Sequence, residues 1–186
     1  MIEVQNIIKS FDGTEIIKGV STVFDKGKTN LIIGQSGSGK TVFLKCLLSL
    51  FIADSGKILF EGKGLKKMSI KERSILRQEM GMVFQGSALF DSMNVEENIM
   101  FPMQMFTQKD DDEIRDRANL VIKRVNLINA NSKYPDEISG GMKKRVAIAR
   151  AIVMNPKYLF CDEPNSGLDP KTCLLYTSDA ADEEDS

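Results

Sequence analysis

Residues 34–41 read Gly-Gln-Ser-Gly-Ser-Gly-Lys-Thr and match the pattern G-x-x-x-x-G-K-S/T of a phosphate-binding loop. The run before it, Thr29–Ile33, is nearly all apolar and is bounded by turn residues, which predicts a short strand buried on both faces. The run after it, Thr41–Phe51, is apolar almost all round, as expected for a helix packed in an interior. A glycine-rich loop between a buried strand and a helix is the setting in which this pattern binds phosphate.

Each residue type in this loop has a physical task. Glycines let the backbone turn so that N–H groups point at phosphate oxygens, and the following helix adds the positive end of its dipole. Lys40 supplies a charge for the β- and γ-phosphates, and the Thr41 hydroxyl is a ligand for Mg²⁺. The strand–helix context disfavours the alternative of a flexible turn without a ligand. We therefore predict nucleotide contacts from Gly34, Ser36, Gly37, Ser38, Gly39, Lys40 and Thr41.

Two adjacent carboxylates follow another apolar run. Tyr158–Cys161 is predicted to be a buried strand, and Asp162 and Glu163 come directly after it. Such a strand can aim Asp162 at the metal bound by Thr41, while Glu163 orients or deprotonates a water that attacks the γ-phosphate. An acidic loop is the alternative, and it loses weight because a complete phosphate loop lies upstream. The pair favours hydrolysis over transfer to an organic acceptor.

Strands and helices alternate along the rest of the chain, which predicts an α/β sheet with a mainly helical stretch inserted before the last strand. The capping box of Ser69 and Glu72 opens one helix, and Gly140-Gly141 opens another. The predicted strands are Ile2–Ile8, Ile16–Phe24, Ile58–Phe60 and Met80–Phe84, and the remaining helices are Ser69–Glu79, Asp110–Val125 and Met142–Met154.

Composition excludes several kinds of chemistry. The 186 residues carry 25 Lys or Arg and 26 Asp or Glu, so no overall basicity indicates nucleic acid. The chain as given has no histidine, which excludes His-based metal sites and Ser-His triads. Three cysteines without C-x-x-C spacing fit a reducing cytosol. No run reaches the about 20 apolar residues of a membrane-spanning helix, so we expect a cytoplasmic protein or subunit.

The last fourteen residues, Cys173–Ser186, read CLLYTSDAADEEDS and carry five acids and no base. One interpretation is a solvated acidic tail. Within it, Cys173–Glu183 also resembles, residue for residue, the translation of a common transposon-based sequencing adapter. We therefore expect residues 173–186 to be non-native and the authentic chain to end near Thr172.

The segment Ile138–Met142, Ile-Ser-Gly-Gly-Met, is by itself a common helix entry. Together with the loop and the acidic pair, however, the chain resembles the ATP-binding subunit of an ABC transporter over about residues 1–172. This segment matches the family's signature motif, and Ser166–Asp169 matches its D-loop. Gln85 stands at the glutamine loop, and Phe11 lies where the family stacks an aromatic ring on adenine.

The resemblance implies a P-loop NTPase with an N-terminal antiparallel β part and an inserted helical subdomain, truncated at the C-terminus. The expected regions are 1–87 for the first core part, 88–154 for the helical subdomain and 155–172 for the return to the core. It also implies a head-to-tail homodimer that holds two ATP molecules with Mg²⁺. Each ATP would contact the phosphate loop of one subunit and Ser139, Gly140 and Gly141 of the other, with Gln85 a metal ligand and catalytic residue and Asp169 a further contact.

A narrower resemblance comes from Phe84–Met93, Val95–Asn98, Phe101-Pro102 and the Ser-Gly-Gly-Met-Lys-Lys-Arg form of the signature. These segments resemble the Mla/Mce-type lipid transporters of bacteria with outer membranes. Met142 replaces the glutamine of the general signature, a change that is usual in this subgroup. The resemblance implies an ATPase on the cytoplasmic face of the inner membrane that drives phospholipid transport. Its partners would be a multi-span permease near the glutamine loop and a lipid-carrier protein.

Two segments allow two interpretations each. The methionine-rich stretch Met93–Phe106 is either core of the helical part or a flexible groove that receives a helix of the membrane subunit. Lys143, Lys144 and Arg145 form either a solvated helix face or a contact for lipid headgroups or nucleotide.

The family continues beyond the D-loop with another strand and with a histidine that contacts the γ-phosphate. Without that strand, the strand that feeds Gly34 and the strand that ends at Asp162 lose a ladder partner. We therefore expect the 186-residue chain to be unstable or inactive. The alternatives are a soluble ABC ATPase acting on ribosomes or DNA and a truncated, non-catalytic nucleotide-binding fragment. A P-loop kinase leaves Ser139–Gly141 unexplained.

Overall fold

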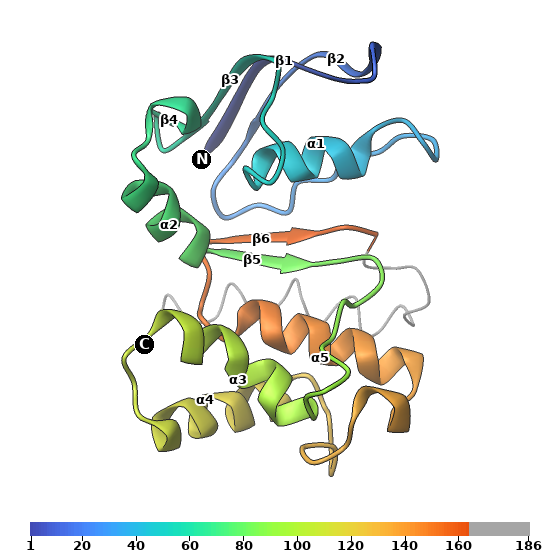
Figure 1. Cartoon of the computed structure of the whole chain (residues 1–186), viewed down its shortest axis with the longest axis vertical. Coiled ribbons are helices and arrows are strands. Elements are labelled where there is room, and N and C mark those ends of the chain that lie inside the picture. Colours follow the sequence, from blue (N-terminus) through green and yellow to red (C-terminus); the bar gives the residue numbers. More distant parts are fainter. Residues whose placement is uncertain (164–186) are drawn as a thin grey trace. The chain divides into compact units, whose positions relative to one another are not determined.

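The computed structural model describes residues 1–163. The chain divides into two compact units, Met1–Arg77 and a second that begins at Gln78 (Figure 1). The interpretations that concern the D-loop with Asp169 and the acidic tail 173–186 lie outside the described residues.

The first unit contains a four-stranded antiparallel sheet with the order β2-β1-β3-β4. Strand β1 (Ile2–Phe11) lies at its centre because it pairs with both β2 (Thr14–Phe24) and β3 (Ser55–Phe60), while β4 (Lys63–Gly64) extends the edge. The alternation in the sequence puts Ile2, Val4 and Ile7 among the buried residues. Three of the four strands predicted in this unit are present, each somewhat longer than expected.

The strand predicted at Thr29–Ile33 is absent, so this prediction is wrong. The run has no regular structure, and Leu31 and Ile33 are 79% and 84% exposed. An apolar run becomes a buried strand only if neighbouring strands satisfy its backbone and cover its faces. Neither sheet in the described part of the chain includes this run. An apolar composition alone therefore does not make this run a strand, because strand formation also requires neighbouring strands to pair with it.

Helix α1 (Lys40–Leu47) follows the phosphate loop and is shorter than the predicted Thr41–Phe51. It buries Phe43, Leu44, Cys46 and Leu47, and the Phe43 ring lies 6.4 Å from the Phe24 ring of β2. The helix therefore covers part of the sheet in its own unit. Burial raises the pKa of the Cys46 thiol, which keeps this side chain an apolar packing group.

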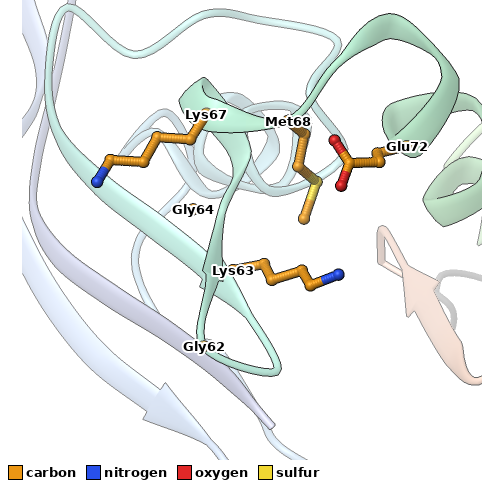
Figure 2. Close-up of a pocket in the computed structure, with 6 residues that line it drawn as sticks. All are labelled: Gly62, Lys63, Gly64, Lys67, Met68 and Glu72. Carbon is orange, nitrogen blue, oxygen red and sulfur yellow. The ribbon is translucent and has the colours of Figure 1, made fainter.

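Helix α2 (Ile70–Gln78) follows a short 3₁₀ turn, η1 (Leu65–Lys67). The predicted capping box is confirmed: Ser69 N–H donates to Glu72 Oε2 at 2.8 Å, and Glu72 N–H donates to Ser69 Oγ at 3.3 Å. The Ser69 N–H and the Ser69 hydroxyl, which both donate to Glu72 Oε2, lower the pKa of Glu72. A pocket of about 210 Å³ lies beside this cap, lined by Gly62, Lys63, Gly64, Lys67, Met68 and Glu72 (Figure 2). Lys63 and Lys67 extend in different directions in Figure 2, so the pocket does not gather their charges on one ligand.

The second unit contains a parallel pair of strands, β5 (Met80–Val83) and β6 (Tyr158–Cys161). Helix α5 approaches β5 so closely that a Cβ at Gly81 would collide with the carbonyl oxygen of Ala151. The prediction that β6 is buried holds only for Phe160, because Leu159 on the other face is 43% exposed. In the described residues β6 pairs with β5 alone.

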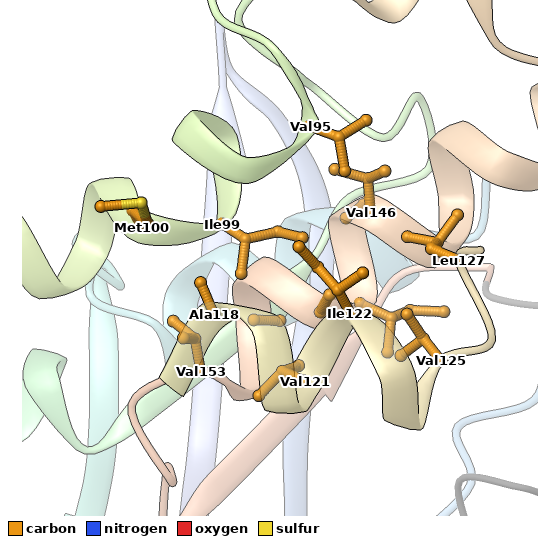
Figure 3. Packing of buried hydrophobic residues seen from close by; sticks show 14 of the residues in the cluster. Val95, Ile99, Met100, Ala118, Val121, Ile122, Val125, Leu127, Val146 and Val153 are labelled. Atoms are coloured by element: carbon orange, nitrogen blue, oxygen red, sulfur yellow. The ribbon is translucent and has the colours of Figure 1, made fainter. Parts of the chain in front are cut away.

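Three helices build the main hydrophobic core of the second unit: α3 (Val95–Phe106), α4 (Asp111–Arg124) and α5 (Gly140–Ile152). A 3₁₀ turn, η2 (Pro135–Glu137), precedes α5. Figure 3 shows side chains of this core facing one another. The apolar face predicted for the second of these helices is confirmed, since Ile114, Ala118, Val121, Ile122 and Val125 are all buried.

The methionine-rich stretch divides between its two interpretations. Met100 and Met103 are buried in the helical core, which confirms the core interpretation for them. Met105 and Phe106, at the end of α3, are 60% and 51% exposed. No helix in residues 1–163 combines the length and the apolar character needed to cross a bilayer.

Candidate nucleotide site

The phosphate loop ends at a glycine that no other residue can replace without strain. Gly39 is the N-cap of α1 and has φ +92°, in the left-handed region. A Cβ on Gly39 would lie 2.9 Å from Ile17 Cδ1 and 3.2 Å from the carbonyl oxygen of Ile16. The chain can therefore turn from the loop into the helix only where the side chain is a hydrogen atom.

The Lys40 side chain folds back over the loop. Its Nζ donates to the carbonyl oxygens of Gly34 and Gln35, both at 2.9 Å. The Ser38 N–H donates to the Gln35 carbonyl at 3.2 Å and closes the turn below. The positive charge is thus fixed at the mouth of the loop, where the sequence predicted a phosphate contact.

The start of α1 differs from the starts of the other helices with a defined cap. Its N-cap Gly39 has no side-chain cap, and its first turn carries no acidic residue. By contrast, Asn94 caps α3, Asp110 caps α4 and Ser139 caps α5, each through a side-chain oxygen. The first N–H groups of α1 and its dipole therefore fit an external anion such as a phosphate.

Phe11 has a defined position and an accessible ring. It is 39% exposed, its ring meets that of Phe51 edge to face at 5.4 Å, and the Lys9 ammonium lies 5.1 Å from its centroid. Asp54 in turn accepts from Lys9 Nζ and from the Ser10 N–H, both at 2.7 Å, and these bonds lower its pKa. The remaining exposed surface of the ring can stack on a base. Sequence reasoning identified Phe11 but missed its support by Phe51.

In the second unit the strand register brings Gln85 and Glu163 together. Val83 is paired with Cys161 at the ends of β5 and β6, so residues two positions further on emerge at the same level. Gln85 Nε2 donates to Glu163 Oε2 at 2.6 Å. Glu163 has φ +49°, a left-handed conformation that is uncommon outside glycine.

Asp162 continues the ladder and is only 8% exposed. Its N–H donates to the Val83 carbonyl at 2.9 Å, which fixes the backbone beside the end of β5. Asp162, Glu163 and Gln85 therefore occupy one edge of the strand pair. Oxygen ligands of this kind suit Mg²⁺.

Ser139, Gly140 and Gly141 form the start of α5. The Ser139 hydroxyl oxygen accepts from the Met142 N–H at 3.3 Å, as the interpretation of a helix entry predicted. A hydroxyl that accepts one bond retains its own O–H as a donor, so capping and anion binding are compatible. The neighbouring Lys143, Lys144 and Arg145 are half-buried, and Arg145 Nη1 donates to the Asn126 carbonyl at 3.3 Å.

Sequence reasoning missed two polar residues, one buried and one half-buried, that contact the segment after Gln85. Asn98 is fully buried, and Arg150 donates to the carbonyl of Ser87 at 2.9 Å. Burial lowers the pKa of the Arg150 guanidinium. The available signal was a polar residue inside an otherwise apolar helical run, such as Arg150 between Ala149 and Ala151.

Comparison with known proteins identifies the family of this chain. The family model described as ABC transporter matches residues 17–166, which is most of the chain. The chain therefore belongs to the ABC transporter family.

Curated relatives support this family. The probable ribonucleotide transport ATP-binding protein mkl of Mycobacterium leprae is 43% identical over 169 residues, covering 91% of this chain and 49% of the relative. The methionine import ATP-binding protein MetN of Clostridium tetani is 41% identical over 172 residues, covering 92% and 54%. The chain thus spans about half the length of the curated relatives it matches.

Solved structures show the same fold. A dimeric structure of a bacterial ABC transporter cassette has a TM-score of 0.89 and 28% identity, covering 100% of this chain and 84% of the other. A dimeric cassette bound to ADP and Pi has a TM-score of 0.86 and 28% identity, covering 94% and 79%. A part of the ABC transporter complex cbiONQ from Clostridium perfringens has a TM-score of 0.82 and 33% identity, covering 95% and 72%. The fold is that of an ABC-type P-loop NTPase, as predicted.

Proposed function

We propose that this chain is the ATP-binding and ATP-hydrolysing subunit of an ABC transporter. The observation that carries this proposal is the phosphate loop: a lysine fixed over it, a glycine-only turn and a helix start without its own cap. The relative bound to ADP and Pi supports ATP as the nucleotide. Phe11 would stack on the adenine.

In this proposal Thr41, Gln85 and Asp162 hold Mg²⁺, which would neutralise charge on the β- and γ-phosphates. Gln85 is suited to a double role because its Nε2 donates to Glu163 while its Oε1 is the atom that can bind a cation. Glu163, held in this way, would accept a proton from the attacking water.

We further propose a head-to-tail homodimer in which the Ser139–Gly141 segment of one subunit faces the nucleotide on the other. The support is the start of α5, whose first turn contains no acidic residue and whose Ser139 hydroxyl retains a donor. The dimeric form of the related cassettes supports a dimer. Asp169 would add a contact there.

We propose phospholipid as the transported substrate, because Phe84–Met93 and the Ser-Gly-Gly-Met form of the signature resemble the Mla/Mce-type ATPases. The subunit would then bind peripherally to the cytoplasmic face of the inner membrane. Its partners would be a multi-span permease docked near Gln85 and a lipid-carrier protein. The exposed Met105 and Phe106 offer apolar surface for a permease helix. The helical subdomain is proposed to span residues 88–154.

A titration with Mg-ATP tests the nucleotide step. The unmodified chain should bind Mg-ATP, and the Lys40→Met variant should lose at least about tenfold in affinity because the fixed charge is gone. Arg77→Met is a matched control on the same unit, since Arg77 also donates to a carbonyl, that of Ser49, at 3.3 Å. Absence of binding by the unmodified chain would refute the proposed function.

The substrate is tested by reconstitution with the permease encoded beside this gene. ATP hydrolysis in proteoliposomes should rise when a phospholipid-loaded carrier protein is supplied. Stimulation by methionine or by a ribonucleotide instead would assign the activity that the names of the relatives suggest. Stimulation by ribosomes or DNA without a permease would favour the soluble ABC ATPase.

A further inference from the structure

Arg150 is a half-buried cation that forms no ion pair with a carboxylate within the described residues. Its Nη2 donates to the Ser87 carbonyl at 2.9 Å, and its guanidinium carbon lies 5.6 Å from the centroid of the Phe90 ring. A planar guanidinium can stack on a ring and donate in its own plane at once, which an ammonium cannot do. Both contacts of Arg150 reach the segment 84–94, which follows β5 and is called here the Gln85 turn.

The Gln85 turn has a backbone that needs such support. Ser87 and Ala88 both have positive φ angles, +62° and +47°, and Ser87 is only 6% exposed. Two consecutive non-glycine residues in the left-handed region are strained and persist only when surrounding contacts hold them. The hydrogen bond from Arg150 is made to the first of these two residues.

Helix α3 holds the other end of the Gln85 turn. Asn98 Oδ1 accepts from the Phe90 N–H at 2.9 Å, and Asn98 Nδ2 lies within 2.9–3.1 Å of the carbonyl oxygens of Phe90, Met93 and Asn94. The Phe90 ring also packs on Phe101 with centroids 4.8 Å apart. Asn98 is 0% exposed, so these bonds are shielded from water and costly to break.

The same two helices connect the Gln85 turn to the signature motif. Arg150 lies eleven residues after Ser139 on the continuous helix α5, and α5 packs against α3 through the core that contains Val146 and Ile99. A core at native packing density transmits a displacement because it cannot deform freely. This packing gives a physical route by which a displacement of the Gln85 turn can reach the start of α5.

We propose that Arg150 is a positioning residue that fastens the Gln85 turn to α5, so that Gln85 and Ser139 move as one body during the nucleotide cycle. The expected effect of this attachment on ATP hydrolysis rests on the proposed function. The attachment itself is a property of the second unit and is measurable without nucleotide.

Hydrogen–deuterium exchange on the full chain tests the attachment. In Arg150→Met, amides of residues 84–94 should exchange about tenfold faster than in the unmodified chain, while those of 146–152 keep their protection. Arg150→Lys should restore only part of the protection, because lysine can donate to the Ser87 carbonyl but has no plane to lay on Phe90. Unchanged exchange at 84–94 in Arg150→Met would overturn the proposal.

Arg117→Met is the matched control. Arg117 also bridges to α5, donating to the Val153 carbonyl at 3.0 Å and to Asn155 Oδ1 at 2.8 Å, but it does not contact the Gln85 turn. It should loosen residues near 153–155 and leave 84–94 protected. If both variants accelerated exchange at residues 84–94 equally, Arg150 would only stabilise the helical core in general, and the proposal would be refuted.

Kinetics provide a second measurement that distinguishes the two proposals. Arg150→Met should lower kcat for ATP about tenfold with little change in KM, because the phosphate loop is untouched. If the unmodified chain binds Mg-ATP but hydrolyses none, the alternative of a truncated, non-catalytic fragment is favoured, while the exchange experiment still decides the attachment. If Arg150→Met does not fold, Phe90→Leu replaces it, with faster exchange at 84–94 expected and wild-type exchange overturning the proposal.

Discussion

The two units hold their proposed nucleotide contacts in opposite ways. In the first unit, residues 34–38 are exposed, and helix α1 has no cap of its own. In the second unit, the turn that carries Gln85 is fixed by Asn98 on α3 and by Arg150 on α5.

This difference indicates a division of tasks. The start of α1 in the first unit has no side-chain cap, so phosphate oxygens can accept hydrogen bonds from its backbone N–H groups. Internal bonds in the second unit fix positions in advance, which suits groups that must orient a water or transmit movement. We therefore propose that the first unit supplies contacts for phosphate and that the second unit holds the water-orienting groups in place.

The largest expected effect separates binding from hydrolysis. Glu163→Gln removes the carboxylate that would accept a proton, so kcat should fall by about 100-fold or more, while affinity for Mg-ATP persists. Phosphate release and a binding titration measure the two quantities on the same preparation. Phosphate release at the unmodified rate would favour a non-catalytic nucleotide-binding module.

Core packing in the second unit gives the next largest effect. Ile99 is 0% exposed within α3, so Ile99→Ala should lower the free energy of unfolding by about 2–5 kcal/mol through lost burial and a residual cavity. The matched control in the first unit is Ile70→Ala on α2, where the side chain is 91% exposed and a change within about 0.5 kcal/mol is expected. Denaturant titration compares them, and equal losses would contradict the assigned burial.

The next smaller expected effect on the free energy of unfolding comes from the helix caps of the second unit. Asn94 accepts from the Glu97 N–H at 2.9 Å, and the Glu97 carboxylate accepts from the Asn94 N–H at 2.8 Å. Asn94→Ala should therefore cost about 1 kcal/mol of unfolding free energy. Asp110→Ala at the start of α4, which has one such bond at 2.8 Å, is the comparison. No loss in either variant would show that these caps contribute nothing to stability.

The smallest effect concerns the ion pair of the half-buried Lys9 with the exposed Asp54. The pKa of Asp54 is lowered from 3.8 by the bonds from Lys9 and Ser10, so its stabilisation is present above that ordinary value. As pH falls through the lowered pKa of the folded state, the carboxylate is protonated and the contribution is lost. Asp54→Asn should flatten the acid side of the stability–pH profile. An unchanged profile would show that the pair contributes nothing measurable.

Local patterns predicted local structure well. The capping box of Ser69 and Glu72 and the apolar face from Ile114 to Val125 are both present, because each depends on residues a few positions apart on the same helix. The phosphate loop was recognised because its pattern encodes a backbone shape rather than a distant contact.

Non-local partners caused the errors. The run Thr29–Ile33 has the composition of a buried strand, but no neighbouring strand pairs with it in the described residues, and Leu31 and Ile33 lie exposed. For the same reason the outer face of β6 at Leu159 is half exposed. The burial of a strand depends on which elements pack against it, so its own residues do not determine it.

The sequence by itself determined the glycine-lysine loop, the helix faces and the family, because these rest on short patterns with fixed spacing. Only the tertiary structure brought Gln85 to Glu163 through the pairing of β5 and β6, and Arg150 to the carbonyl of Ser87. These residues are 78 and 63 positions apart, respectively. Contacts over such separations follow from strand register and helix packing, which no local pattern specifies.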